Sequence, residues 1–275
     1  MAKKRKTKTD PGLLGRWILA LGIICSVMTA FALTLSLWPS VPEAPAPEPT
    51  LAPNPYGAAD FGYEGDFLTC LSGESRVGID VSSHQGRIDW QKVADAGVEF
   101  VFVRLGYRGY MNGTIHEDTY ARTNLAQARA AGLQVGAYFF SQAISQAEAK
   151  EEAEFALEIL DGFRLDLPLV YDWEYVSDMA RTANVTKDEL MRYTKVFCDA
   201  VEAAGHQPMI YFNRYLAQSH LELTELTQYP FWLAMYTDQM TYPHRVDFWQ
   251  YSDSGRVPGI EADVDLNIWM PRNEV

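Results

Sequence analysis

Two carboxylates, Asp172 and Glu174, stand two residues apart within Leu169–Tyr175, a segment whose other residues are apolar or aromatic. Such a segment is typical of a buried β-strand, and residues i and i+2 of a strand point to the same face. Two acids on one face at the end of an apolar strand are costly unless they are paired, solvated or used in chemistry. The spacing therefore predicts a functional carboxyl pair that the rest of the chain presents to a substrate.

The chemistry that suits such a pair is cleavage of a glycosidic bond. One protonated carboxyl serves the leaving oxygen, and the second carboxylate stabilises or attacks the sugar cation. Crowding helps, because like charges hold one of the two acids protonated near neutral pH. The five histidines show no H-x-H or H-E-x-x-H spacing, and no G-x-S-x-G, P-loop or G-x-G-x-x-G motif is present. We therefore expect neither a metal nor a cofactor.

The surrounding sequence alternates apolar strands with helices that close on glycine, a pattern that indicates right-handed βαβ units around a parallel sheet. Strands are predicted at 77–82, 100–105, 135–140, 167–174 and 209–212, and helices at 90–96, 118–131, 145–160 and 186–204. The final third offers strands at 231–236, 247–252 and 263–267 with short connections. We expect an α/β fold, a modified (β/α) barrel of about five βα units followed by strands with few helices. An open doubly wound sheet is the alternative.

Polar side chains recur at the C-terminal ends of these predicted strands, and in a parallel barrel that rim is where active sites are built. We therefore expect a shared, carboxylate-lined cleft there. The predicted catalytic residues are Asp80, Asp172, Glu174 and Asp265. The predicted substrate-binding residues are Arg104, Tyr138, Tyr211, Gln250 and Trp249, the last as an aromatic ring able to stack on a sugar.

The N-terminal region has a different character. Residues 1–16 carry six Lys or Arg and one acid, and Trp17–Trp38 is an uncharged run of 22 mostly apolar residues. That length suits a helix crossing a bilayer, and the basic tail favours a cytoplasmic N-terminus. The alternative is a cleaved signal peptide, whose apolar region is usually shorter. We expect a single-pass anchor at 17–38, with the remaining chain outside the cell membrane and facing the cell wall.

Residues 39–75 are predicted to be a linker and lead-in, because seven of the chain's 14 prolines fall between Pro39 and Pro55. The catalytic domain is then expected at 76–275. From Tyr56 onward there are 17 basic and 33 acidic residues, a balance that argues against nucleic acid as a partner. Three cysteines lie far apart without metal-ligand spacing, and no obligate protein partner can be inferred.

An ordered set of motifs carries a family resemblance. The motifs are Gly78-Ile-Asp-Val-Ser-Ser-His-Gln-Gly86 with Ile88-Asp-Trp90, Phe102-Val-Arg-Leu-Gly-Tyr107, Gly136-Ala-Tyr-Phe-Phe-Ser141, Tyr171-Asp-Trp-Glu174, Trp249-Gln-Tyr251 and Val264-Asp-Leu-Asn267. In order and spacing they resemble family 25 glycoside hydrolases, the Chalaropsis-type lysozymes, over about residues 76–270. A single motif would be weak evidence, but the ordered set is highly specific.

The resemblance implies a modified β/α barrel that hydrolyses the β-1,4 bond between N-acetylmuramic acid and N-acetylglucosamine in peptidoglycan. The acids of the family pattern fall here on Asp80, Asp172, Glu174 and Asp265. The sequence departs at His84, where many members have an aromatic residue such as Trp or Tyr, and one sugar-stacking contact is thereby in doubt.

The mechanism we expect gives Glu174 the role of general acid, while Asp172 stabilises positive charge or orients the 2-acetamido group of the substrate as nucleophile. Asp80 and Asp265 would tune the protonation of the pair, and Tyr138 and Tyr211 would bond the acetamido group. Two alternatives remain at this point. One is a membrane-tethered wall-binding protein without turnover, and the other is a hydrolase of another amino-sugar polymer such as chitin.

Overall fold

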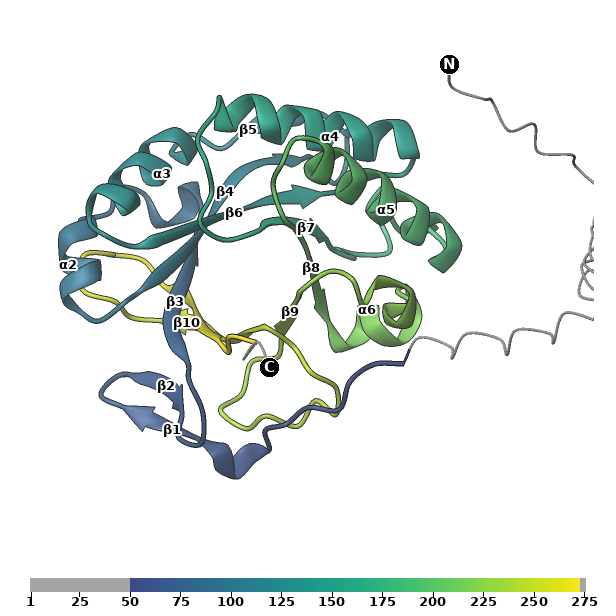
Figure 1. Ribbon diagram of the computed structural model, residues 1–275. Helices are drawn as coiled ribbons and strands as arrows, with labels where there is room; N and C mark the ends of the chain where they lie inside the picture. The colour runs from purple at the N-terminus through teal and green to yellow at the C-terminus, as the bar shows by residue number, and fades with distance from the viewer. Residues whose placement is uncertain (1–49, 273–275) are drawn as a thin grey trace, which may run out of the picture. The chain divides into compact units, whose positions relative to one another are not determined.

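Eight strands close into a barrel in the computed structural model, which describes residues 50–272 (Figure 1). The sheet has nine strands in the order β3-β11-β10-β9-β8-β7-β6-β4-β5, and an added β3–β4 pairing closes the ring and leaves β5 outside it. This closure confirms the predicted barrel and excludes the open doubly wound sheet. The barrel strands are β3 (Arg76–Val81), β4 (Phe100–Arg108), β6 (Gln134–Ser141), β7 (Leu169–Trp173), β8 (Pro208–Asn213), β9 (Phe231–Ala234), β10 (Phe248–Gly255) and β11 (Val264–Trp269).

One strand of the ring runs against the other seven. Neighbours from β3 through β10 pair in parallel, whereas β11 is antiparallel to both β10 and β3. The sequence had placed Asp265 at the C-terminal end of a strand, but it is the second residue of β11. Because β11 runs against its neighbours, its N-terminal end lies at the same rim as the C-terminal ends of the parallel strands. Asp265 therefore lies at the predicted rim, but near the N-terminal end of an antiparallel strand.

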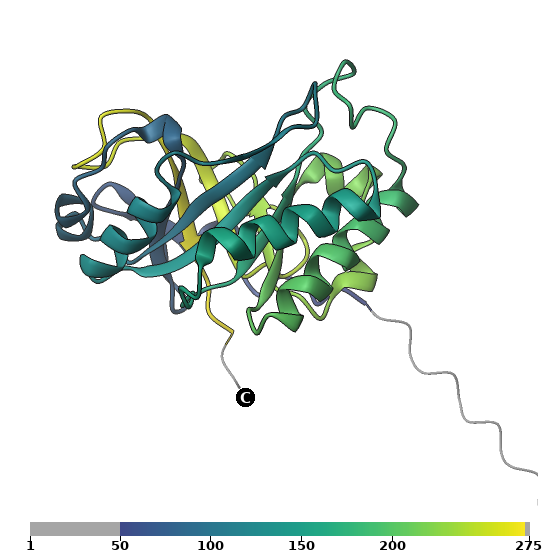
Figure 2. The same ribbon diagram turned by 90° about the horizontal axis from the view of Figure 1, so that it is seen from above.

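Five α-helices cover the outside of the barrel in the described part of the chain (Figures 1 and 2). Ser145 and Thr186 cap the two longest of these helices, and each accepts a hydrogen bond from a backbone N–H of the first turn. Both residues are the predicted starts of their helices. No α-helix stands between β9 and β10 or between β10 and β11, in keeping with the expected loss of helices. The helices are α2 (Trp90–Asp95), α3 (Ala121–Ala130), α4 (Gln146–Leu160), α5 (Lys187–Ala203) and α6 (Arg214–Ser219).

Alternation along the strands sorts side chains between two cores. Phe100 and Phe102 of β4 belong to a small cluster inside the barrel, whereas Val101 and Val103 belong to the larger layer under the helices. The interior has room for these rings because a Cβ at Gly78 or Gly136 would lie 2.2 or 2.3 Å from them. The barrel is thus filled by side chains and offers reactive groups only at its rim.

Part of the predicted lead-in folds against the barrel. Strands β1 (Phe61–Glu64) and β2 (Phe67–Cys70) form an antiparallel hairpin. The ring of Phe61 meets Trp249 edge-on at 5.2 Å between ring centroids, and the backbone N–H of Leu68 donates to Tyr251 Oη at 3.2 Å. The hairpin therefore covers the outer face of β10. Short elements complete the fold: η1 (Ala58–Asp60), η2 (Ser83–Gln85), η3 (Leu223–Leu226) and β5 (Ile115–Glu117).

Within residues 50–272 no helix has both the length and the apolar character that a bilayer crossing requires. The predicted anchor Trp17–Trp38 lies outside the described residues.

Candidate active site

The structure brings the four predicted acids together at one rim of the barrel. We call Asp80, Asp172, Glu174 and Asp265 the acid cluster. Asp80 lies in β3, directly opposite Asp265 of β11 in the strand register. Asp172 lies in β7, and Glu174 is the first residue after that strand, which ends one residue earlier than the predicted strand 167–174. The charges of Glu174 and Asp80 both raise the pKa of Asp172, so acids from β3 and β7 act on one another.

Asp80 is fixed by two amide groups. Its side chain is buried, and Oδ2 accepts hydrogen bonds from Gln250 Nε2 and Asn267 Nδ2, each at 2.8 Å. The indole Nε1 of Trp232 donates to Asn267 Oδ1 at 2.8 Å, and Tyr211 Oη donates to Gln250 Oε1 at 3.1 Å. Each amide is thereby held in the orientation that points its N–H groups at Asp80.

Asp80 and Asp265 form the first coupled pair of the acid cluster. Burial raises the pKa of Asp265 to about 9, and the negative charge of Asp80 and a hydrogen bond to it act in the same direction. Burial also raises the pKa of Asp80, whereas hydrogen bonds from Asn267, Gln250 and Asp265 oppose that rise. The arrangement indicates a protonated Asp265 that donates to an ionised Asp80 near neutral pH.

Asp172 and Glu174 form the second coupled pair. Burial raises the pKa of Asp172 well above its usual range, and the charges of Glu174 and Asp80 raise it further. Burial raises the pKa of Glu174 to about 6, while its hydrogen bond with Asp172 lowers it. The proton of this pair therefore rests on the deeper residue. Asp172 Oδ1 is buried and has no hydrogen-bond partner among the described residues, so it is an unsatisfied acceptor of the pair.

Arg104 lowers the pKa of two members of the acid cluster. It lies on the interior face of β4, and its positive charge lowers the pKa of Asp80 and of Asp172. The guanidinium is itself held by Asp118, with Nε 2.9 Å and Nη2 2.8 Å from Oδ2, and Nη2 also donates to Ser83 Oγ at 3.2 Å. Because Asp118 and Ser83 accept hydrogen bonds from this guanidinium, Arg104 acts on the acid cluster through its positive charge.

Two predicted tyrosines lie inside the barrel at the acid cluster. Tyr138 and Tyr211 are nearly buried, and each packs edge-on against Trp232, at 6.2 and 5.0 Å between ring centroids. Burial raises the pKa of both tyrosines well above the usual value, and the neighbouring acids add to the effect. Both hydroxyls therefore stay protonated and can act as hydrogen-bond donors.

Trp249 is not brought to the acid cluster. Its side chain is fully buried in the outer core, where Nε1 donates to the backbone carbonyl of Met235 at 2.8 Å. The reason is the pleat of β10, which turns Gln250 inward and its neighbour outward. Its predicted role as a sugar-stacking ring is therefore not supported by its position, and the indole instead joins β10 to the hairpin through Phe61.

Three residues of the site escaped the sequence prediction. Asn267 stands in the last family motif, and its strand position two residues after Asp265 was a usable signal for the same face. Tyr236 is half exposed and donates to Gln250 Oε1 at 3.2 Å. It thereby places an exposed aromatic ring beside the amide that holds Asp80. Asp118 stands beyond β5 with no local pattern that pairs it with Arg104. His84, where the family pattern is broken, is exposed.

Another buried carboxylate, that of Glu152 on α4, lies outside the barrel and belongs to a separate network. Arg108 Nε donates to Glu152 Oε1 at 2.7 Å, and its Nη2 donates to Glu151 Oε2 at 2.7 Å. The other oxygen of Glu152 accepts from Ser141 Oγ at 2.6 Å. Burial raises the pKa of Glu152 to about 7, whereas the bonds from Ser141 and Arg108 oppose the rise. We call Arg108, Ser141, Glu151 and Glu152 the outer network.

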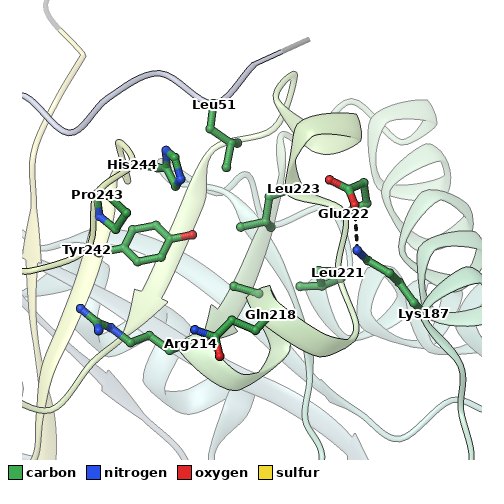
Figure 3. A pocket seen from close by; sticks show the side chains of 11 residues that line it. Leu51, Lys187, Arg214, Gln218, Leu221, Glu222, Leu223, Tyr242, Pro243 and His244 are labelled. Carbon is green, nitrogen blue, oxygen red and sulfur yellow. Dashed lines mark hydrogen bonds and ion pairs between the residues drawn. The ribbon is translucent and has the colours of Figure 1, made fainter. Parts of the chain in front are cut away.

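A cavity of about 280 Å³ lies on the flank of the barrel between α6 and the connection that precedes β10 (Figure 3). Its two cationic side chains are already engaged, because Lys187 pairs with Glu222 at 2.7 Å and Arg214 donates to Thr241 Oγ1. No member of the acid cluster lines it. The cavity is therefore separate from the site. Among the residues that the structure describes, no group of three or more His, Cys, Asp or Glu side chains is placed to hold a metal ion.

The class of protein follows from the fold and the site together. A closed α/β barrel carrying coupled carboxyl groups at the rim of its parallel strands is the arrangement of a glycoside hydrolase. Residues 79–260 match the family model described as Glycosyl hydrolases family 25, and the chain belongs to this family.

Known proteins similar to this chain agree with that assignment. It is 33% identical over 206 residues to Uncharacterized protein YegX of Escherichia coli (strain K12), covering 70% of this chain and 68% of that protein. It is 27% identical over 191 residues to Autolytic lysozyme of Clostridium acetobutylicum, covering 69% and 54%. The solved modular autolysin LytC from Streptococcus pneumoniae matches with a TM-score of 0.62 and 30% identity, covering 71% of this chain and 47% of that one.

This chain thus spans about half the length of that autolysin. The matches to the family and to lysozymes identify the chain as a glycoside hydrolase of the lysozyme class.

Proposed function

We propose that this protein is a membrane-tethered peptidoglycan hydrolase that cleaves the β-1,4 bond between N-acetylmuramic acid and N-acetylglucosamine. The observation that carries the chemistry is the coupled pair of Asp172 and Glu174. Asp172 Oδ1 is buried without a hydrogen-bond partner among the described residues, and the pKa of Glu174 is about 6. The substrate class is supported by the relative named autolytic lysozyme and by the autolysin LytC, which was solved with a synthetic peptidoglycan ligand.

Glu174 is the general acid in this proposal, because it is the less buried member of the pair and a leaving group can reach it. Before substrate binds, the shared proton rests on Asp172. An acetamido N–H of the substrate that donates to Asp172 Oδ1 favours the charged form of that carboxyl. The proton then passes to Glu174, and from there to the glycosidic oxygen as the bond to the anomeric carbon breaks.

Asp172 has the complementary role. Once ionised, it stabilises the positive charge that develops at the sugar and orients the 2-acetamido group, whose oxygen attacks the anomeric carbon. Water then opens the resulting ring, with Glu174 taking back a proton as general base. Asp265 stays protonated beside the ionised Asp80 during these steps. The electrostatic field that these two residues exert on the reacting pair therefore stays the same.

The test is the digestion of purified peptidoglycan, followed by mass analysis of the soluble fragments after borohydride reduction. We expect fragments that end in reduced N-acetylmuramic acid, and a parallel digest of chitin oligosaccharides should release little. Fragments that end in reduced N-acetylglucosamine would contradict the assigned bond. Efficient cleavage of chitin would favour the alternative substrate class.

The catalytic assignment is tested with Glu174→Gln, which keeps the shape of the side chain and removes the proton donor. We expect a loss of activity of about 10²–10⁴-fold, the usual contribution of general acid catalysis. Normal binding to insoluble wall without turnover is expected of this variant. If it cleared walls at a near wild-type rate, the role of Glu174 would be wrong.

The tether is the part of the proposal that rests on sequence alone. The uncharged run Trp17–Trp38 and the basic tail before it support an N-terminus in the cytoplasm and a hydrolase domain facing the wall. We expect the full chain to stay with membranes after an alkaline carbonate wash, and protease added outside the cells to digest only the hydrolase domain. Release of a shortened chain into the medium would favour the cleaved signal peptide instead.

A further inference from the structure

The sheet ladder ends one step before the proposed general acid. Strands β6 and β7 pair in parallel, and the last register pair is Ser141 with Trp173. The next pair in that register would be Gln142 with Glu174. Glu174 therefore stands where the backbone leaves the sheet, and strand pairing no longer fixes its position. Something else must hold the chain there if its carboxyl is to stay beside Asp172.

The side chain of Gln142 takes the place of the missing ladder contact. It is fully buried, and its Nε2 donates to the backbone carbonyl of Glu174 at 2.7 Å and to that of Ser141 at 2.9 Å. The backbone of Gln142 has meanwhile turned away, since its carbonyl accepts from Arg181 Nη1 at 3.1 Å. A side-chain amide thus joins the ends of β6 and β7 where the two backbones separate.

Gln142 is itself held from the far side. Its Oε1 accepts a hydrogen bond from Thr182 Oγ1 at 3.2 Å, so the amide cannot turn over without losing all three contacts. Arg181, which bonds the backbone of Gln142, is in turn clamped by both oxygens of Glu148, at 2.7 and 3.0 Å. The connection between β7 and α5 is therefore tied back to β6 at two neighbouring residues.

We propose that Gln142 is a positioning residue of the glycosidase reaction, whose side-chain amide holds the backbone of Glu174 so that its carboxyl stays against Asp172. The inference rests on the proposed role of Glu174 and extends it to a residue outside the family motifs quoted above. Only a side chain with two N–H donors and an acceptor in this geometry satisfies both carbonyls and Thr182. A displacement of a catalytic group by about 1 Å can cost on the order of 100-fold in rate, which is the effect expected here.

The experiment compares two variants of the full-length protein. Gln142→Met fills the same space but removes both donors to the backbone. Thr182→Val removes the contact on the other side of the amide and leaves the bond to Glu174 in place. We expect Gln142→Met to lower kcat on the order of 100-fold with little change in KM, and to move the alkaline limb of the pH–rate profile. Thr182→Val should lower thermal stability and reduce kcat far less than Gln142→Met, with the limb in place, because both donors of the Gln142 amide remain.

A third variant covers the case in which Gln142→Met does not fold. Arg181→Lys leaves the amide of Gln142 intact and loosens only its backbone, so a smaller loss of kcat with the same movement of the limb is expected. Wild-type kcat and limb in Gln142→Met, or in Arg181→Lys if the first variant cannot be measured, would overturn the inference. An equal loss of kcat in Thr182→Val would do so as well, because it would show a purely structural network.

Glu174→Gln in the same assay separates this inference from the proposed function. If Glu174→Gln is inactive and Gln142→Met behaves as wild type, only the positioning role is wrong. If Glu174→Gln retains activity, the proposed mechanism itself has failed, whatever Gln142 does.

Discussion

The outer network and the acid cluster each hold a buried carboxylate, Glu152 and Asp172, and the two groups differ in what faces it. In the outer network, Glu152 is met by Arg108 at 2.7 Å and by a serine hydroxyl. In the acid cluster, Asp172 faces Glu174 and Asp80, and its Oδ1 has no partner among the described residues. Removing one member of a buried ion pair costs stability, whereas relieving crowded like charges restores it. The first group should therefore serve the fold, and the second the reaction.

Of the substitutions that compare these two groups, Asp172→Asn should have the largest effect on activity and should separate activity from stability. The amide cannot become the carboxylate that stabilises the sugar cation, so we expect kcat to fall about 10²–10³-fold. The pKa of Asp172 is raised in the folded state, so its stabilising contribution is present below its unfolded pKa and is lost as the pH rises. At pH 7 the variant should therefore melt no lower than wild type. Normal activity of the variant would indicate that Asp80, and not Asp172, is the carboxylate that stabilises the sugar cation.

Glu152→Gln should have the opposite signature. Because Arg108 is left with only one carboxylate partner in a buried site, we expect the free energy of unfolding to fall by about 3 kcal/mol. The pKa of Glu152 is raised from 4.5 to about 7, so its contribution to stability is present below pH 4.5 and is lost as the pH rises through 7. Urea unfolding at pH 4.5 and 7 measures both effects. A large drop in kcat at a temperature where the variant is folded would erase the distinction between the two groups.

The pH dependence of activity tests the acid cluster without a mutation. The reactive form of the pair holds one proton, which rests on Asp172 before substrate binds, whereas Glu174 takes up a second proton below its pKa of about 6. We therefore expect kcat/KM to fall as the pH drops below 6 and to hold above it until Asp172, whose pKa is raised well above its usual range, loses its proton. Initial rates from pH 4.5 to 8 at constant ionic strength provide the measurement. A loss of about tenfold per pH unit from pH 6 upward would mean that the pair does not keep its proton on Asp172.

Tyr211→Phe should have the smallest effect. The hydroxyl of Tyr211 donates to Gln250 Oε1, but Tyr236 donates to the same oxygen, so the amide that holds Asp80 keeps one donor. We expect a loss of about two- to tenfold in kcat/KM, the value of one hydrogen bond. Tyr251→Phe is the matched control, because its hydroxyl lies on the outer face of β10 and accepts from the hairpin. An equal loss in the control would indicate a general effect on the barrel.

The sequence predicted those parts of the site that depend on spacing along one strand. Asp172 and Glu174 share a face because they are two residues apart, and the barrel follows from apolar strands that alternate with helices. Trp249 and Gln250 were both assigned to the site, but adjacent residues of a strand face opposite sides, and the structure turns only Gln250 towards Asp80. The direction of β11 was equally beyond reach, because a short apolar strand has no pattern that distinguishes parallel from antiparallel pairing.

Partners brought together by folding were harder to predict. Asp118 bonds Arg104 from beyond β5, and Gln142 bonds the backbone of Glu174 across two strands. Neither contact involves residues close in sequence, and neither residue type is unusual in its local setting. Such positions are defined by geometry in three dimensions, so a motif read along the chain cannot contain them.

The antiparallel closure by β11 has a consequence for the order of events in the life of the chain. The amides that hold Asp80 come from residues 170 and 187 positions further along the sequence, and Asp265 comes from the same final strands. Contacts of such sequence separation form late, because loop-closure entropy opposes them until the rest of the barrel exists. A chain still being synthesised thus carries Asp172 and Glu174 without the partners that surround them in the finished barrel. We therefore expect hydrolytic activity to begin only when β11 has closed the ring.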